Sequence, residues 1–215
     1  MTSSSNADSA PSSRHVFSTV DSAIVLRLLQ SICLEVSQAL DFEAALRRLL
    51  ELVCINTEWV FGEIWLPKDA QSLCHSGIWH TSRQALYALG TRSESWCFLR
   101  GEGLPGRVWA QRQSEWIANV SKASHVDFQR RDLVIAYGLG AALAVPVTFA
   151  DDAVSMVLVF FMDRAEDPDY AQVHLVEAIA AQLGAILCLK HTEAELLQHE
   201  QQLQRLLNTL PGIVF

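Results

Sequence analysis

The sequence predicts an α+β domain in which an antiparallel sheet is flanked by helices from both ends of the chain. Three observations support this prediction. Apolar residues recur at helical spacing near both ends, short apolar segments rich in β-formers fill the middle, and turn residues separate those segments in pairs. Half of the 215 residues are hydrophobic, which is enough for one well-buried core.

Two consecutive amphipathic helices are expected near the N-terminus. The first begins at Asp21 or Ser22, both good N-caps, and a cap at Asp41 begins the second. Residues 1–18 precede them as a leader that we expect to be disordered, since it is Ser-rich and has no apolar stretch of the kind found in signal peptides. The apolar positions of the two helices are Ile24, Leu28, Ile32, Val36 and Leu40, then Phe42, Ala45, Leu46, Leu49, Leu50 and Val53.

Four strands are predicted, in two hairpins. Trp59–Leu66 is rich in β-formers and is expected to pair with Leu73–His80. Ala141–Phe149 and Ser155–Met162 are apolar on both faces, so we expect them to be central strands covered on each side. The turns of the two hairpins are Pro67–Asp69 and Asp151–Asp152.

The segments between the two hairpins are expected to be loops and short helices. Ser82–Leu89 is predicted to form a short helix, and Ser124–Tyr137 a loop followed by another. Between them lies Arg100–Trp109, with glycines and a proline that suit a structural turn. It lacks the Lys-Ser/Thr ending of a phosphate-binding loop and the spacing of a dinucleotide fingerprint, so phosphate binding is not expected there.

The C-terminal helix begins at Tyr170 and continues well past Leu189. Its leucines recur every seven residues, which predicts a seam for a parallel homodimer, and two glutamates in that seam would make it weak. The alternative is a linker helix that packs on its own domain. The seam consists of Leu189, Leu196, Leu203 and Leu210, with Ile186, Glu193, Glu200 and Leu207 at the companion positions.

Composition excludes several functions. The 16 basic residues do not cluster and the net charge is −8, so nucleic acid is not an expected partner. No stretch approaches the roughly 20 apolar residues of a membrane span, and no motif of a hydrolase or metalloprotease is present, so we expect neither membrane insertion nor enzymatic activity. The cysteines favour a reducing cytoplasm with buried, inert thiols over a disulfide framework or structural zinc, since they are odd in number and widely spaced: Cys33, Cys54, Cys74, Cys97 and Cys188.

Several of these motifs together resemble the GAF domain family of bacterial and cyanobacterial sensor proteins. The resemblance covers Ser31–Leu189 and rests on the run GEGLPGRVW at 101–109 and the run AVPV at 144–147, with support from Trp116-Ile117, Gly138-Leu139 and Phe160-Phe161-Met162. The family implies a sheet of about six antiparallel strands. Terminal helices are expected on one face, and a small-molecule pocket under loops on the other. The final residues, Leu206–Phe215, resemble the opening of a PAS domain.

The resemblance places a ligand pocket above the sheet, lined by about 82–143 and the second strand. Aromatic walls with a few polar groups suit a planar ligand. The other interpretation is that these aromatic residues fill the core of a domain whose pocket has closed. The candidate cofactor-binding residues are Trp79, His80, Trp96, Cys97, His125, Phe128 and Tyr137, with Arg130 or Arg131 nearby.

The cofactor is not identified by the sequence. Haem could be held by His125 or His80, since imidazole suits iron. His75 cannot easily join His80, because residues five apart on one strand face opposite sides. Covalent attachment of a bilin is less favoured, because the family's attachment cysteine would lie in 127–139, where this chain has none.

The sequence therefore predicts a cytoplasmic sensory module from a signal-transduction protein of the sensor histidine kinase or diguanylate cyclase type. Such a two-component input would signal through a dimeric C-terminal helix. Two alternatives stay open: a ligand-free dimerisation platform, and a small redox enzyme of the free methionine sulfoxide reductase type that uses Cys74 and Cys97. The expected domain limits are 1–18 for the leader, 19–190 for the GAF domain, 191–210 for the coiled coil and 211–215 for the start of a PAS domain.

Overall fold

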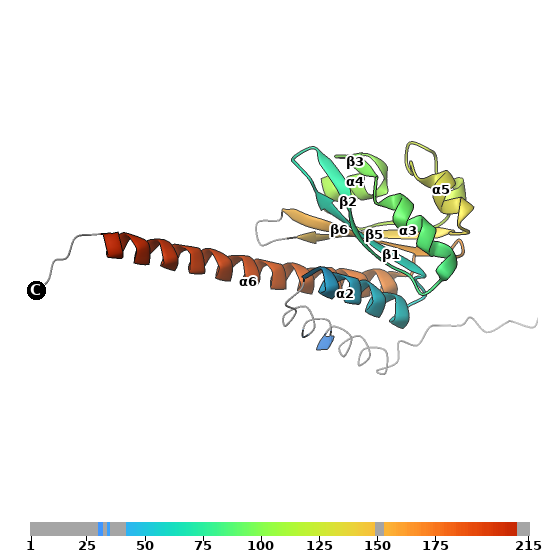
Figure 1. Cartoon of the computed structure of the whole chain (residues 1–215). Helices are drawn as coiled ribbons and strands as arrows, with labels where there is room; N and C mark the ends of the chain where they lie inside the picture. The colour runs from blue at the N-terminus through green and yellow to red at the C-terminus, as the bar shows by residue number, and fades with distance from the viewer. Residues whose placement is uncertain (1–29, 32–33, 35–41, 149–152, 210–215) are drawn as a thin grey trace, which may run out of the picture.

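The computed structural model describes residues 30–31, 34, 42–148 and 153–209 (Figure 1). Residues 30, 31 and 34 are helical, as predicted for the first helix. The remainder of that helix, the leader and the PAS-like tail at 211–215 lie outside the described residues.

Five α-helices and six strands make up the main body of the described chain. The helices are α2 (Phe42–Asn56), α3 (Tyr87–Ser93), α4 (Gly103–Gln111), α5 (Arg131–Ala136) and α6 (Tyr170–Thr209), with 3₁₀ turns at Gln84–Leu86 and Val120–Lys122. The strands are β1 (Phe61–Pro67), β2 (Ser72–His80), β3 (Cys97–Leu99), β4 (Glu115–Ile117), β5 (Ala141–Thr148) and β6 (Val154–Met162).

The strands form one antiparallel sheet in the order β3-β2-β1-β6-β5-β4. Both predicted hairpins are confirmed, β1 with β2 and β5 with β6. Strands β5 and β6 lie in the interior of the sheet, as their composition predicted, with β1 beside β6, and the short strands β3 and β4 form the edges. Strands β3 and β4 were not predicted, since three residues each carry too little pattern to be recognised.

Each face of the sheet is covered by its own layer (Figure 1). Helices α2 and α6 lie side by side on one face, where their apolar residues pack against strand residues such as Ile64, Leu143 and Phe160. Helices α3, α4 and α5 cover the other face. This arrangement confirms the α+β fold with terminal helices on one side of the sheet.

The face under α3, α4 and α5 is filled by a second apolar cluster, which we call the inner cluster. Most of its members are almost completely buried, and many are aromatic. The inner cluster includes Phe61, Trp65, Leu73, Phe98, Leu104, Trp109, Phe128, Val134, Leu139 and Phe161, with Trp79, Trp96 and Tyr137 packed against it. The interpretation of a core filled by its own side chains therefore fits the described residues better than an open pocket.

The glycine-rich stretch 100–109 forms more than the predicted turn, because helix α4 begins inside it at Gly103. The turn is confined to its start, where Gly101 and Gly103 have positive φ angles. Gly106 lies in the first turn of α4, where an added Cβ would be 2.4 Å from the carbonyl oxygen of Leu99. The glycines therefore let the helix begin in contact with strand β3.

The expectation of only unpaired thiols is wrong for one pair of cysteines. Cys74 of β2 and Cys97 of β3 form a disulfide, because the two residues stand opposite each other on neighbouring antiparallel strands. Their separation of 23 residues in sequence hid this pairing. Cys54 and Cys188 are free, and burial raises the pKa of the Cys54 thiol to about 12, so the inert thiol was correctly predicted there. Cys33 lies outside the described residues.

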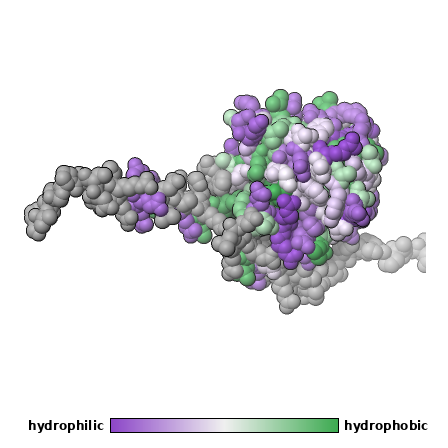
Figure 2. Space-filling view, viewed as in Figure 1, coloured by the Kyte–Doolittle hydropathy of each residue, from purple (hydrophilic) through white to green (hydrophobic). Residues whose placement is uncertain are grey.

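Helix α6 is one continuous helix of 40 residues that projects beyond the sheet (Figure 1). Its first half, Tyr170–Leu189, has a mean hydropathy of 1.6 and is long enough to cross a membrane by length and composition. Four of its apolar residues are buried in the core, so this part of the helix packs on the sheet through one side: Val176, Ile179, Ala180 and Leu183. Figure 2 shows hydrophilic residues on the projecting part.

Candidate functional site

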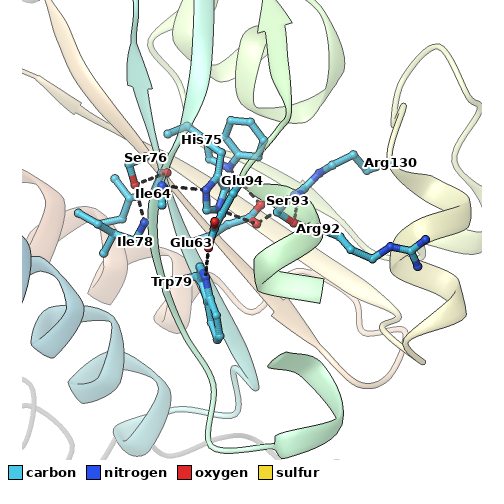
Figure 3. Close-up of polar contacts among 12 residues, drawn as sticks. Glu63, Ile64, His75, Ser76, Ile78, Trp79, Arg92, Ser93, Glu94 and Arg130 are labelled. Atoms are coloured by element: carbon cyan, nitrogen blue, oxygen red, sulfur yellow. Dashed lines mark hydrogen bonds and ion pairs between the residues drawn. The ribbon is translucent and has the colours of Figure 1, made fainter. Parts of the chain in front are cut away.

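A carboxylate lies at the centre of the sheet. Glu63 is the only charged residue among the buried residues of β1, and its exposure is 0 %. It follows Phe61 by two positions, so it faces the inner cluster. A charge in such a place is stable only when it is paired and hydrogen-bonded, and Glu63 has several polar neighbours (Figure 3).

The main partner of Glu63 is Arg130, which occupies the N-cap position of α5 and is 1 % exposed. Its two terminal nitrogens contact both carboxylate oxygens: Nη1 donates to Oε2 at 3.1 Å, and Nη2 donates to Oε1. Nη1 also donates to the hydroxyl of Ser93 at 2.7 Å. This two-point contact is the strong form of an arginine–carboxylate pair, and it joins α3, α5 and β1 across the inner layer.

Aromatic rings surround the pair. The guanidinium carbon of Arg130 lies 4.9 Å from the ring centroid of Trp65 and 5.8 Å from that of Phe161. The indole nitrogen of Trp65 donates to Glu63 Oε1 at 3.0 Å. Cation–π attraction and the indole hydrogen bond both strengthen in this water-excluded place, so Trp65 binds each partner of the ion pair.

His75 of β2 completes the cluster. Its Nδ1 accepts a hydrogen bond from the backbone N–H of Gly77 at 3.0 Å, so the proton of a neutral ring lies on Nε2. Nε2 is 3.6 Å from Glu63 Oε2 and, among the described residues, has no hydrogen-bond partner. The Nε of Arg130 is also buried without one. The polar cluster of Glu63, Arg130, Ser93 and His75 is thus tightly packed but not fully hydrogen-bonded.

The ion pair keeps Glu63 ionised. Burial alone would raise the pKa of this carboxyl group, but the charge of Arg130, assisted by the nearby imidazole of His75, lowers it from 4.5 to about 2. A carboxylate with such a low pKa, closed off from solvent, is a poor general base at neutral pH. Its role is therefore to hold α5 against the sheet through Arg130 rather than to transfer protons.

Acid should weaken the fold through this group. Because the folded-state pKa of about 2 lies below the ordinary value of 4.5, the stabilisation is fully present above pH 4.5 and is lost as the pH falls through the folded value. We expect protonation of Glu63 to lower the free energy of unfolding by about 3 kcal/mol. Urea unfolding of the wild type and of Glu63→Gln between about pH 7 and pH 2 measures it. The stability difference between the two proteins should shrink as the pH falls, and a constant difference would contradict the prediction.

Four of the residues predicted from sequence do lie together at the inner cluster. Trp79 stacks on Phe61 with ring centroids 6.1 Å apart, and Trp96 packs on Phe98 at 6.0 Å. Phe128 is 2 % exposed, and Tyr137 packs at the edge of the cluster. These residues fill the layer that the family resemblance assigned to a pocket.

The other three predicted residues lie elsewhere. His80 is on the opposite face of β2, where Glu51 and Arg47 of α2 are its charged neighbours and burial lowers its pKa. The side chain of His125 is 61 % exposed, with Asp132 at 3.8 Å. Cys97 is held in the disulfide. The described residues therefore do not fit a haem held by His80 or His125, nor a bilin attached to Cys97.

One hollow of about 370 Å³ lies outside the inner layer, between the end of α4, strand β5 and α6. Its wall is mixed: Arg112, Gln113 and Glu177 are polar, whereas Val145 and Pro146 are apolar. None of its residues takes part in the polar cluster.

Sequence reasoning missed Glu63, Ser93 and the role of His75. Glu63 carried a usable signal, since a single charge inside an otherwise apolar strand requires a buried partner. Arg130 was recognised only as a lining residue. The contact between them spans 67 residues, so no local pattern could have paired them.

Comparison with known proteins identifies the fold independently. A family model described as the GAF domain matches residues 39–187. Among solved structures, a GAF domain from A. aeolicus in an inactive state is 17 % identical, with a TM-score of 0.62 over 79 % of this chain and 99 % of its own.

Two further structures have comparable likeness. A GAF domain of a phosphoenolpyruvate-protein phosphotransferase from Coxiella burnetii is 17 % identical, with a TM-score of 0.63 over 80 % of this chain and 96 % of its own. The free methionine-R-sulfoxide reductase of Neisseria meningitidis, solved with its substrate, is 15 % identical, with a TM-score of 0.61 over 80 % and 93 %. No curated protein matches the chain. At these identities the structures establish the fold alone.

Proposed function

The chain belongs to the GAF domain family, and on that premise we propose that it is a regulatory module that passes a change in its inner layer to a dimeric C-terminal helix. The observation that carries the proposal is the form of α6. One end of this helix is buried in the core of the domain through Val176 and Leu183, and the same unbroken helix runs on to Thr209. A rigid helix that is both part of the core and an extension can carry a displacement outward.

The projecting part of α6 offers a surface for a second copy of the chain. Leu189 and Leu196 are each 60 % exposed, at positions seven residues apart. Exposed leucines in a heptad repeat are typical of a coiled-coil seam. Glu193 and Glu200, also exposed, interrupt the seam and would make the dimer weak enough to respond to small changes.

The polar cluster supplies the second half of the mechanism. Glu63 lies on β1, which pairs with β6, and β6 pairs with β5, on which α6 packs. A movement of Arg130 or His75 that alters β1 would therefore reach α6 through two neighbouring strands. Among the described residues the cluster keeps two buried donors without partners, so an alternative arrangement that paired them would offset part of the cost of disturbing the ion pair.

A second candidate function is a dimerisation platform that binds no ligand. The filled inner cluster favours it, since Trp65, Phe98 and Phe161 occupy the space under the helices. Native mass spectrometry of protein purified from cells separates the two functions. A bound small molecule that is released on denaturation supports sensing. A mass that equals that of the polypeptide, with no added ligand mass on monomer or dimer, supports the platform.

We extend the proposal to a larger protein that contains this module, on the basis of the sequence resemblance to GAF and PAS domains of sensor proteins. A cytoplasmic signal-transduction protein of the sensor histidine kinase or diguanylate cyclase type, with a PAS domain beginning at 211–215, would place α6 between two modules. The methionine sulfoxide reductase alternative receives no support from Cys74 and Cys97, because their neighbours Leu73 and Phe98 face the inner cluster and the two cysteines therefore face away from it.

The seam is tested by mutation. Leu189→Glu combined with Leu196→Glu should raise the dissociation constant of the dimer at least about tenfold, because it adds charge to the seam. Sedimentation velocity over a range of concentrations measures the change. Val126→Glu is the matched control, since Val126 is 82 % exposed on the loop before α5, and it should leave the dimer unchanged.

A substitution that removes charge from the seam provides a second test. Glu193→Leu removes one of the repelling charges and should tighten the dimer by about tenfold or more. A chain that stays monomeric in the wild type and in Glu193→Leu alike would contradict the proposal.

A further inference from the structure

The disulfide lies at the edge of the sheet, where the solvent can reach it. Cys97 belongs to the edge strand β3 and is exposed, and Cys74 is half-buried on β2. The backbone N–H of His75 donates to the carbonyl of Trp96 at 3.0 Å, so Cys74 and Cys97 form the next, non-hydrogen-bonded pair. Side chains approach most closely in such pairs, so the two sulfur atoms can bond or separate without a change in strand register.

The other described cysteines differ from this pair. Cys54 is half-buried on α2, and burial raises the pKa of its thiol to about 12. Cys188 is half-buried on α6, without a second described cysteine beside it. Thiol–disulfide exchange requires an accessible sulfur, and among the described cysteines Cys97 is the exposed one.

We propose that Cys74 and Cys97 form a reversible redox site through which thiol reductants and peroxides set the state of the module. In the reducing direction, two thiol groups of a small dithiol or a reductant protein give two electrons and two protons to the sulfur–sulfur bond. The products are two cysteine thiols here and a disulfide in the reductant. In the oxidising direction, the two thiols reduce one peroxide molecule, the disulfide forms, and two water molecules leave when hydrogen peroxide is the oxidant.

The site connects directly to the polar cluster. Phe98 follows Cys97 in β3, and its ring lies 4.9 Å from that of Trp65. Trp65 in turn contacts Arg130 and donates to Glu63. On the other strand, Cys74 precedes His75, whose backbone is hydrogen-bonded to Trp96.

Reduction of the disulfide would free one end of a strand of only three residues. The remaining ladder between β2 and β3 is short, so Phe98 and Trp96 would gain freedom to move at the edge of the inner cluster. The redox site by itself is independent of the proposed function, whereas its effect on α6 rests on that function.

The test begins with the wild-type chain in native buffer. The sequence has five cysteines, and reduction of the described disulfide by dithiothreitol should add two free thiols to those present in the oxidised form. After acid quenching, denaturation and alkylation, intact mass spectrometry counts them. The proposal predicts a gain of two adducts with an unchanged far-UV circular dichroism spectrum, and the loss of both with hydrogen peroxide. A protein that gains the two adducts only when it is denatured in the presence of dithiothreitol would overturn the proposal, as would a reduced protein that keeps them after exposure to peroxide.

Tryptophan fluorescence tests the connection to the polar cluster. Trp96 precedes Cys97 in the chain, and the rings of Trp65 and Trp96 both contact Phe98, which follows Cys97, so reduction should shift the emission reversibly. Cys54→Ala with Cys188→Ala should keep the shift, whereas Cys74→Ala with Cys97→Ala should abolish it. Thiol reduction with unchanged wild-type emission would overturn the connection.

The dimer is measured separately. A redox-dependent dissociation constant supports the link to α6. A dimer that ignores the thiol state overturns that link but leaves the dimeric module standing, and a monomer in both states counts against the proposed function alone.

Discussion

Replacing Arg130 with methionine should lower the free energy of unfolding by about 3–5 kcal/mol, because it leaves the carboxylate of Glu63 buried without its counter-charge. Glu63 is 0 % exposed, and Arg130 contacts both of its oxygens. Chemical denaturation at neutral pH, followed by circular dichroism, measures the loss. An effect below about 1 kcal/mol would mean that the ion pair is not formed in solution.

A double substitution separates the pair from simple loss of packing. Glu63→Gln with Arg130→Met removes both charges, and the glutamine oxygen can still accept the hydrogen bond from the indole of Trp65. The double variant should therefore be more stable than Arg130→Met alone, by about 2 kcal/mol or more. A double variant no more stable than the single one would show that the side chain of Arg130 acts by its volume.

A surface ion pair provides the matched control. Arg83 contacts Asp163 at 2.6 Å, but the arginine side chain is 48 % exposed. Solvent screens such pairs, so Arg83→Met should cost less than about 1 kcal/mol. The contrast between Arg130 and Arg83 measures how much burial contributes to the effect of an otherwise similar contact.

The helices and central strands could be predicted because their patterns are local. Helical spacing predicted Phe42–Val53, and the helix runs to Asn56; runs of apolar β-formers between turn residues predicted both hairpins. The same reasoning failed at β3, at the equally short β4, and at the start of α4. Strand β3 has only three residues, and α4 begins at Gly103, a residue that by itself indicates a turn rather than a helix.

The site could be predicted only in part, since it depends on long-range pairing. Aromatic residues such as Phe128 were correctly expected under the helices, because large apolar side chains fill cores. Strand alternation showed that His75 and His80 face opposite sides, but no local pattern told which side is the inner one. The structure places His75 beside Glu63 and His80 beside α2. The disulfide was hidden for the same reason, as it depends on a strand that sequence reasoning did not find.

Gly184 of α6 is expected to reverse the usual effect of alanine in a helix. In an exposed helical position, replacing glycine with alanine stabilises a protein by about 1 kcal/mol. At Gly184 an added Cβ would lie 2.2 Å from the backbone carbonyl oxygen of Thr148 at the end of β5. Because a backbone oxygen cannot rotate away as a flexible side chain can, α6 must shift from the sheet, and we expect Gly184→Ala to lower the free energy of unfolding by about 1–3 kcal/mol.

The sign of this change tests whether α6 is held against β5 in solution. Ala185→Ser, at the next and exposed position, enlarges a side chain without a clash and should change stability by less than about 0.5 kcal/mol. Hydrogen exchange should also be faster at Val176 and Ile179 in Gly184→Ala, since both are buried in the core that this contact closes. A stabilised Gly184→Ala protein would mean that α6 is not docked there. The route from the inner layer to the C-terminal helix would then lose its last step, because a helix that does not contact β5 cannot respond to the sheet.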